Sequence, residues 1–192
     1  MFLKLGMYEH YEDQLVLKLF NYFTCTTPSM IAPPTGTPSL LREIWKRGNE
    51  WHLLEHDHYN CFGFNIFSIE SLDDISLSIF GDSEERQAWS ERETNKNGKF
   101  SVSCADLSWR AFASFSEFDF LFICIKEESK EHGTVRHIIN NCCEEYTIPG
   151  GLLSIFETLL DAVEARKNQI NSAKSQGLCK SLQRMYSSIL TC

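Results

Sequence analysis

Four residues of types that bind zinc lie close together in the chain, in the pattern H-x3-H-x-H-x2-C formed by His52, His56, His58 and Cys61. Histidine and cysteine are common zinc ligands, so the pattern could serve a zinc-dependent hydrolase. The helical zinc-protease motif, however, needs a glutamate directly after its first histidine, and Leu53 stands there. No second cluster with C-x-x-C spacing completes a closed tetrahedral site. We therefore interpret the segment as a polar loop and keep the hydrolase as an alternative.

No other group of residues forms a recognisable catalytic pattern. The chain has eight cysteines and six histidines, so some cysteine–histidine pair is expected by chance. The sequence has no nucleophile elbow, no G-x-G-x-x-G and no phosphate-binding loop. The sequence thus predicts a protein that is not an enzyme, with no catalytic residue, no bound metal and no cofactor.

Acidic residues are concentrated between positions 70 and 96, where eight acids face three bases. A surface of one charge attracts a partner of the opposite charge, and exposed tryptophan is enriched where such partners bind. Trp89 lies within this segment, although it could equally anchor a helix to the core. The alternative for the acids is an ordinary solvated face. The residues predicted to bind a partner, three of them in a later loop, are Asp73, Asp74, Glu84, Glu85, Trp89, Glu127, Glu128 and Glu131.

The strongest strand signal is the apolar run at residues 118–125, in which aromatic and β-branched side chains occupy nearly every position. A charged loop follows at 126–133, and a second strand is predicted at 134–139, so the pattern indicates a hairpin. Asp119 lies inside the first strand, where an unpaired carboxylate would be costly. Its predicted partner is either Arg136 on the second strand or backbone amides.

The rest of the chain predicts helices and strands around this hairpin. Helical spacing of apolar residues favours helices at 9–23, 39–47, 83–93 and 152–163, and short strands are predicted at 62–67, 100–104 and 142–148. Residues 68–80 fit a helix or a strand. We expect three parts: an N-terminal helix with a proline-rich linker (1–37), a main domain (38–165) and a basic, amphipathic C-terminal helix (166–192).

The overall composition limits the class of partner. The 192 residues carry a net charge of −8, whereas a general nucleic-acid binder would show a basic surface. The N-terminus does not resemble a secretion signal, and no apolar run approaches the ~20 residues of a membrane span. Irregularly spaced cysteines are typical of reduced thiols. We therefore expect a cytoplasmic protein that binds a basic protein and neither nucleic acid nor membrane, and that could also form a homo-oligomer.

The order of these segments resembles the SUKH superfamily, which includes fungal cell-wall-synthesis regulators and many bacterial immunity proteins. Four pieces carry the resemblance: PSLLREIWKRGNE (38–50), FGFNIFSIESLDD (62–74), SFSEFDFLFICIKEESKEHGTVRHIINN (114–141) and LSIFETLL (153–160). The terminal helices and the segment at 81–98 lie outside this pattern. The positions that match the family are Trp45, Gly48, Asn49, Phe115, Asp119, Phe120, Gly133 and Arg136, which we interpret mainly as fold determinants.

The resemblance implies an α+β fold, with a curved, mainly antiparallel sheet and helices packed on one side. It also implies a non-enzymatic binding protein, most often an antitoxin that neutralises a nuclease or deaminase toxin in the cytoplasm. An acidic domain suits such a basic partner. Two alternatives remain: a regulatory or scaffold protein that oligomerises through its terminal helices, and the zinc hydrolase that would use His52, His56 and His58.

Overall fold

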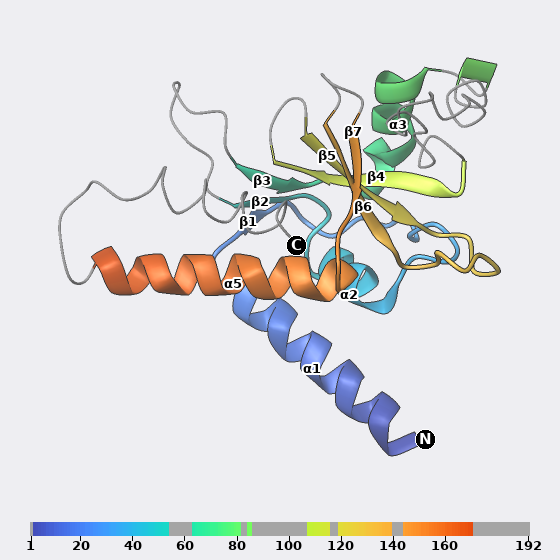
Figure 1. Cartoon of the computed structure of the whole chain (residues 1–192). Coiled ribbons are helices and arrows are strands. Elements are labelled where there is room, and N and C mark those ends of the chain that lie inside the picture. Colours follow the sequence, from blue (N-terminus) through green and yellow to red (C-terminus); the bar gives the residue numbers. More distant parts are fainter. Residues whose placement is uncertain are drawn as a thin grey trace.

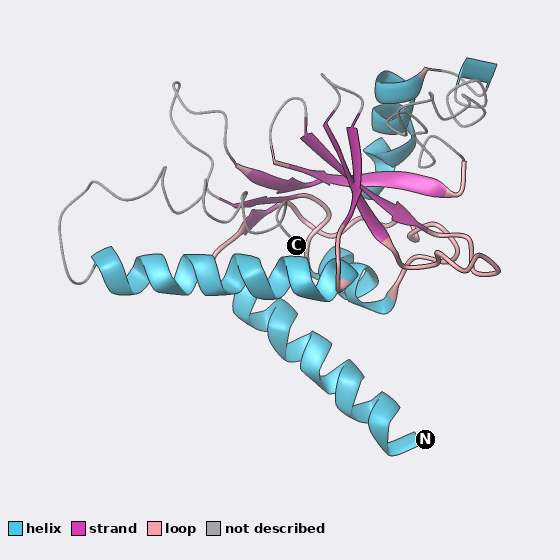
Figure 2. Cartoon of the chain, in the orientation of Figure 1, coloured by secondary structure: helices cyan, strands magenta, loops and turns pink. Residues whose placement is uncertain are grey.

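The structure, a computed structural model, describes residues 2–53, 63–81, 84–85, 107–115, 119–139 and 144–170. The helices are α1 (Phe2–Phe20), α2 (Ser39–Arg47), α3 (Leu72–Phe80, after the 3-10 turn Ile69–Ser71) and α5 (Gly151–Ile170). The strands are β1 (Thr24–Cys25), β2 (Trp51–Leu53), β3 (Phe64–Ile66), β4 (Trp109–Ser114), β5 (Asp119–Cys124), β6 (Val135–Ile139) and β7 (Glu144–Thr147). These elements form the predicted α+β fold (Figures 1 and 2).

The seven strands form one curved, open sheet in which spatial order follows chain order from β1 to β7. Every neighbouring pair is antiparallel. The predicted central hairpin is confirmed: β5 pairs with β6 in a register that sets Leu121 opposite His137 and Phe122 opposite Arg136. The strands predicted at 62–67 and 142–148 correspond to β3 and β7, whereas the one predicted at 100–104 lies outside the described residues.

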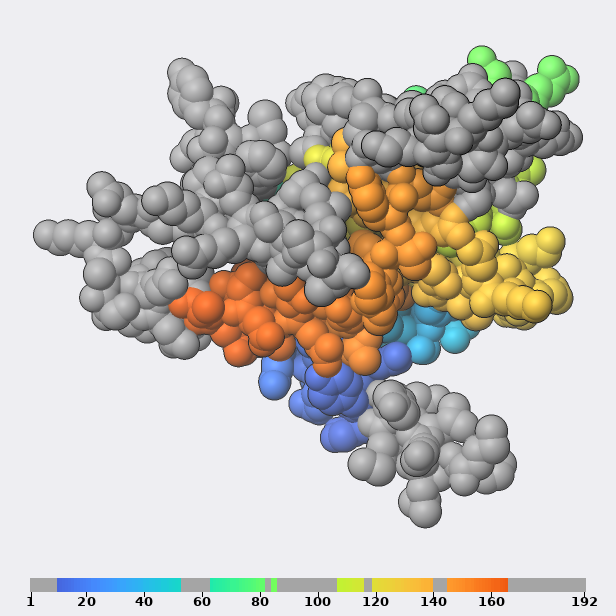
Figure 3. Space-filling model, in the orientation of Figure 1, coloured from blue at the N-terminus to red at the C-terminus, as the bar shows by residue number. Residues whose placement is uncertain are grey.

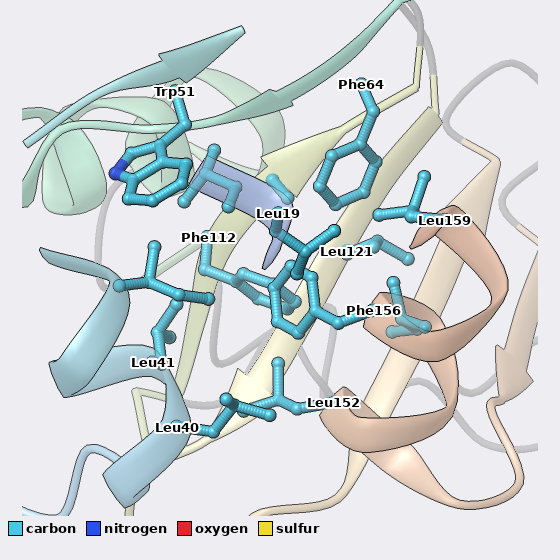
Figure 4. Close-up of a cluster of buried hydrophobic side chains, with 14 of the residues drawn as sticks. Leu19, Leu40, Leu41, Trp51, Phe64, Phe112, Leu121, Leu152, Phe156 and Leu159 are labelled. Atoms are coloured by element: carbon cyan, nitrogen blue, oxygen red, sulfur yellow. The ribbon is translucent and has the colours of Figure 1, made fainter. Parts of the chain in front are cut away.

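Three helices, α1, α2 and α5, cover one face of the sheet and enclose the main core (Figures 1 and 4). The alternation of strand side chains supplies this core, because residues two apart point to the same face. Leu121 and Ile123 of β5 point into it, as does Phe64 of β3. Phe156 of α5 is fully buried and meets Phe64 edge-on, with ring centroids 6.2 Å apart.

Helix α3 packs on the opposite face, beside β4. Its Phe80 joins a second buried cluster with Trp109 of β4 and Phe122 of β5. Its buried Ser76 accepts a hydrogen bond from the amide of Ala111 (3.3 Å), which caps the edge of β4 where β3 has already ended. Residues 68–80 were predicted as either helix or strand, and packing on this edge resolves the choice in favour of a helix.

The N-terminal helix is built into the main core. α1 begins earlier than the predicted residue 9, and Leu15, Val16 and Leu19 on its C-terminal half are buried. The chain then enters β1 directly, and β1 pairs with β2. Residues 1–37 and 38–165 therefore share one core where the structure describes them.

Helix α5 runs past the predicted domain boundary at residue 165, so residues 166–170 continue the same helix. Residues 171–192 lie outside the described part of the chain. The helix predicted at 83–93 also lies largely outside it, since the structure describes only Glu84 and Glu85 there, both helical and exposed.

Helix α2 confirms the helix predicted at 39–47, and it ends at Gly48 as expected. Gly48 does not, however, adopt the left-handed conformation in which glycine usually ends a helix. Its φ of −166° is extended backbone that any residue adopts. Instead, a Cβ at this position would lie 2.7 Å from the Cβ of Cys25 and 2.8 Å from its Sγ. Gly48 therefore lets the end of α2 pass close to β1.

Candidate protein-binding surface

Helix α3 presents two of the predicted acidic residues to solvent. Leu72, Ser76 and Phe80 form its buried face, so Asp73 and Asp74 lie on the opposite, exposed side. The carboxylate of Asp73 lies 2.7 Å from the Nε atom of Arg110 on β4. The side chain of Asp73 is 80% exposed, so this ion pair adds little stability.

The loop between β5 and β6 presents the second group of predicted acids. Glu127 and Glu128 are exposed, and the loop is held in position near its end. The Nε2 atom of His132 lies 2.7 Å from the carbonyl oxygen of Gly36. Gly133 follows with φ +75°, a left-handed conformation that favours glycine, and its amide donates to the carbonyl of Cys124 (2.9 Å).

The start of β4 connects these two acidic elements. The amide of Ile125, at the start of the loop, donates to the carbonyl of Ser108 (2.8 Å), and Arg110 two residues later reaches Asp73. We call the six exposed acids on these elements the acidic end: Asp73, Asp74, Glu84, Glu85, Glu127 and Glu128. The loop and residues 84–85 lie along the same side of the molecule, at the right in Figure 3.

The prediction that Arg136 pairs with Asp119 is wrong, because the two side chains point to opposite faces of the sheet. Arg136 lies opposite Phe122 and faces the α3 side, whereas Asp119 shares the face of Leu121. The guanidinium of Arg136 instead contacts the carboxylates of Glu131 and Glu145.

The environment of Arg136 is a compact charged site. The guanidinium carbon lies 4.6 Å from the ring centroid of Trp109, an arrangement that adds a cation–π contact. The Arg136 side chain is only 14% exposed and that of Glu145 only 10%, so solvent screens the pair weakly. Glu131, predicted to bind a partner, is thus half exposed and engaged with Arg136.

Asp119 is paired with a histidine that the sequence did not single out. The Nε2 atom of His137 lies 3.3 Å from the Oδ1 atom of Asp119, and His137 is 2% exposed. Burial lowers the pKa of His137 below its ordinary value, and the nearby Asp119 carboxylate opposes this shift. The neutral imidazole is therefore favoured at neutral pH.

Comparison with protein families, with curated proteins and with solved structures finds no match to this chain. None of the described helices is both long and apolar enough to cross a membrane.

Of the predicted zinc ligands, only His52 belongs to the described residues. Its Nδ1 atom lies 2.9 Å from the side-chain oxygen of Asn65, on the neighbouring strand β3. Within the described ranges, no three histidine, cysteine or acidic side chains lie close enough together to hold a metal ion. His56, His58 and Cys61 lie outside these ranges, as does Trp89.

The residues predicted to determine the fold make specific contacts around the end of α2. The indole N–H of Trp45 donates to the carbonyl of Phe67 (2.9 Å). Asn49 accepts from the amide of Ile69 (3.0 Å) and donates to Glu70. Ser29 also donates to Glu70, and these hydrogen bonds lower the pKa of that carboxyl group. One polar cluster therefore ties the proline-rich segment and α2 to the start of α3.

Sequence reasoning missed three ionisable residues of these pairs: Arg110, His137 and Glu145. Each lies in or beside an apolar run, where an ionisable side chain indicates a specific partner. Period-two alternation from Trp109 would have placed Arg110 next to a buried position. Identifying the actual partners needs the strand register, which the sequence does not show.

Proposed function

We propose that this protein is a non-enzymatic protein-binding module of the immunity type, which binds and neutralises a basic toxin domain such as a nuclease or deaminase in the cytoplasm. The observation that carries the proposal is the acidic end. Its exposed carboxylates lie on α3 and on the loop between β5 and β6, and both of these elements contact the start of β4. The sequence resemblance to the SUKH superfamily supports the same function.

The geometry suits binding for two physical reasons. First, the acids on α3 are carried by a helix with a buried face. The backbone that carries them is therefore ordered before a partner binds, and less conformational entropy is lost on binding. Second, carboxylates of one sign on one side of the molecule attract a basic partner over a distance of about a Debye length, roughly 8–10 Å in ordinary buffers, which raises the association rate. Inhibition then requires only that the module cover the partner's functional surface.

The experiment neutralises exposed acids that have no structural ion pair to lose. The test variant is Asp74→Asn, Glu127→Gln and Glu128→Gln. Asp73 is spared because its loss would also disturb Arg110. The matched control removes the same number of negative charges from α1 and α5, with Asp13→Asn, Asp161→Asn and Glu164→Gln. The two variants carry equal net charge, so any difference between them reports position.

The partner is captured from cells, identified by mass spectrometry, purified, and its association rate measured at several salt concentrations. We expect the test variant to associate about tenfold more slowly at low salt and with a flatter salt dependence, since steering is lost. The control should stay within about twofold of the unmodified protein. Equal behaviour of the two variants would overturn the assignment of the binding surface to the acidic end.

A further inference from the structure

Four apolar side chains next to the acidic end are exposed to solvent and do not belong to the main core. Met30 is fully exposed, and Ile31, Leu77 and Leu107 are at least half exposed. Single exposed apolar residues are common, but a group of large ones bordered by charge marks an interaction surface. We call these four residues the apolar patch.

Hydrogen bonds and ion pairs connect the elements that carry the patch. Ser29 accepts a hydrogen bond from the amide of Ile31 (3.0 Å) and donates to Glu70, at the start of α3. Along the same helical face come Asp73 and, one turn later, Leu77, because residues four apart are neighbours on a helix.

The opposite border of the patch is equally fixed. Arg110 contacts Asp73 and also donates from its Nη1 atom to the carbonyl of Leu107. Ile31, Leu77 and Leu107 therefore lie on segments joined through Glu70, Asp73 and Arg110, and Met30 precedes Ile31 in the chain. An occupant of this surface needs apolar side chains for the patch and basic side chains for the acids.

The chain itself contains a segment with that chemistry. Residues 171–192 carry three bases and no acid. Their apolar residues recur at helical spacing, at positions Leu178, Leu182, Met185, Tyr186 and Ile189. We propose that the apolar patch binds residues 171–192 of a second copy of this chain, so that the protein associates with itself by exchanging its C-terminal segments.

Geometry favours a second copy over the same chain. α5 starts at the acidic end, since a Cβ on Gly151 would lie 3.5 Å from the carbonyl oxygen of Gly133. Its 20 residues then carry the chain about 30 Å away from that end. Residues 171–178 span at most roughly 28 Å even when fully extended, so Leu178 cannot return along the whole length of α5 to that end. A segment from another copy has no such constraint.

The test uses the full chain in two charge-reversed forms, in reducing buffer so that cysteines do not link the copies. The segment variant carries Lys174→Glu, Lys180→Glu and Arg184→Glu, and the patch variant carries Asp74→Lys and Leu77→Lys. A control reverses two exposed acids on α5, Asp161 and Glu164. Sedimentation measures the mass of each protein, and of an equal mixture of the two variants, over a range of concentrations.

We expect the unmodified chain and the control to shift from 22.2 kDa toward twice that mass as concentration rises. Each variant alone should remain at the single-chain mass, because its segment and patch now repel. Mixing them should restore a dimer, since the intact segment of one meets the intact patch of the other. The shift should weaken between about 0.1 M and about 1 M salt, where the Debye length falls from ~10 Å to ~3 Å.

Three outcomes would overturn the proposal. The unmodified chain could stay at the single-chain mass at every concentration. Both variants could associate as the unmodified chain does, which would assign the contact to another face, such as the exposed side of α1. The mixture could also fail to associate although the unmodified chain does. None of these outcomes bears on the binding of a basic partner, which is measured separately.

Discussion

His137 lies on the core side of β6, fully enclosed between Asp119, the edge of the Phe115 ring and the ring of Tyr146. A neutral imidazole fits this site, whereas a protonated one would lose its hydration and regain only part of it from Asp119. The stability of the sheet centre is therefore linked to pH through one side chain.

The sign of this linkage follows from the lowered pKa of His137. Below its ordinary value of 6.5, the unfolded chain binds a proton that the folded chain binds less readily. We expect the free energy of unfolding to fall as pH decreases through 6.5 toward the folded-state pKa, and His137→Gln to flatten this dependence. Denaturant unfolding between about pH 5 and pH 8 measures it.

The control is His10→Gln, a change at an exposed position on α1 that should leave the pH profile unaltered. If His137→Gln and the unmodified protein had the same pH profile, another group would be responsible for the loss of stability at acidic pH.

Asp119 also shows which information the sequence alone could not supply. The cost of a charge inside the strand at 118–125 correctly indicated that Asp119 needs a partner. Which partner it finds depends on register, because a shift of one residue moves a side chain to the other face of the sheet. Loop geometry sets that register, so Arg136 and His137 were indistinguishable candidates from sequence.

At the scale of elements, Gly48 and Gly133 illustrate two separate reasons for a glycine. Gly48 has ordinary backbone angles and no room for a Cβ. Gly133 has a left-handed φ, and a Cβ there would have open space, with the nearest atom, on Pro38, 3.8 Å away. Helix α2 depends on the first reason, and the hairpin between β5 and β6 depends on the second.

Substitutions at the two positions should distinguish the lack of space at Gly48 from the left-handed backbone at Gly133. Gly48→Ala should destabilise the protein by about 1–3 kcal/mol through overpacking against Cys25, and Gly48→Asn by more. At Gly133, alanine should cost about 1–2 kcal/mol, and asparagine less than alanine, because asparagine tolerates the left-handed region. Chemical denaturation of the four variants tests this opposite ranking, and the same ranking at both sites would contradict it.

Elements with a strong pattern were predictable, and elements whose type depends on their neighbours were not. The alternation or helical spacing at 118–125 and 152–163 identified β5 and α5 directly. Residues 68–80 carry both periodicities, and only the exposed edge of β4 decides between them. The acids of α3 and of the loop were recognised as charged, but their common placement at one end required the tertiary structure.

At the scale of the whole molecule, the N-terminal segment changes how the chain should unfold. A proline-rich stretch ordinarily indicates a linker between independent parts. Here α1 buries Leu15, Val16 and Leu19 against α2 and α5, and the stretch begins with β1, which pairs with β2 of the sheet. We therefore expect a single cooperative unit where composition predicted an attached helix.

Leu19→Ala on α1 should destabilise the entire fold by about 2–5 kcal/mol, as Leu41→Ala on α2 should, because both residues lie in the same core. Far-ultraviolet circular dichroism and tryptophan fluorescence should report the same shifted transition. Leu17→Ala, at an exposed position on the same helix, is the control and should have little effect. If Leu19→Ala shifted the unfolding of only a small helical part of the circular dichroism signal, the protein would not unfold as a single cooperative unit.

The chain-order arrangement of the sheet has a consequence for how the fold is assembled and how it can change. Because each strand in the described part of the chain pairs only with its predecessor and successor, the sheet can grow outward from the β4–β5–β6 meander without waiting for distant parts of the chain to meet. For the same reason, a connection between strands can lengthen or shorten without altering which strands pair. A fold of this kind can acquire new recognition loops while its assembly route stays the same.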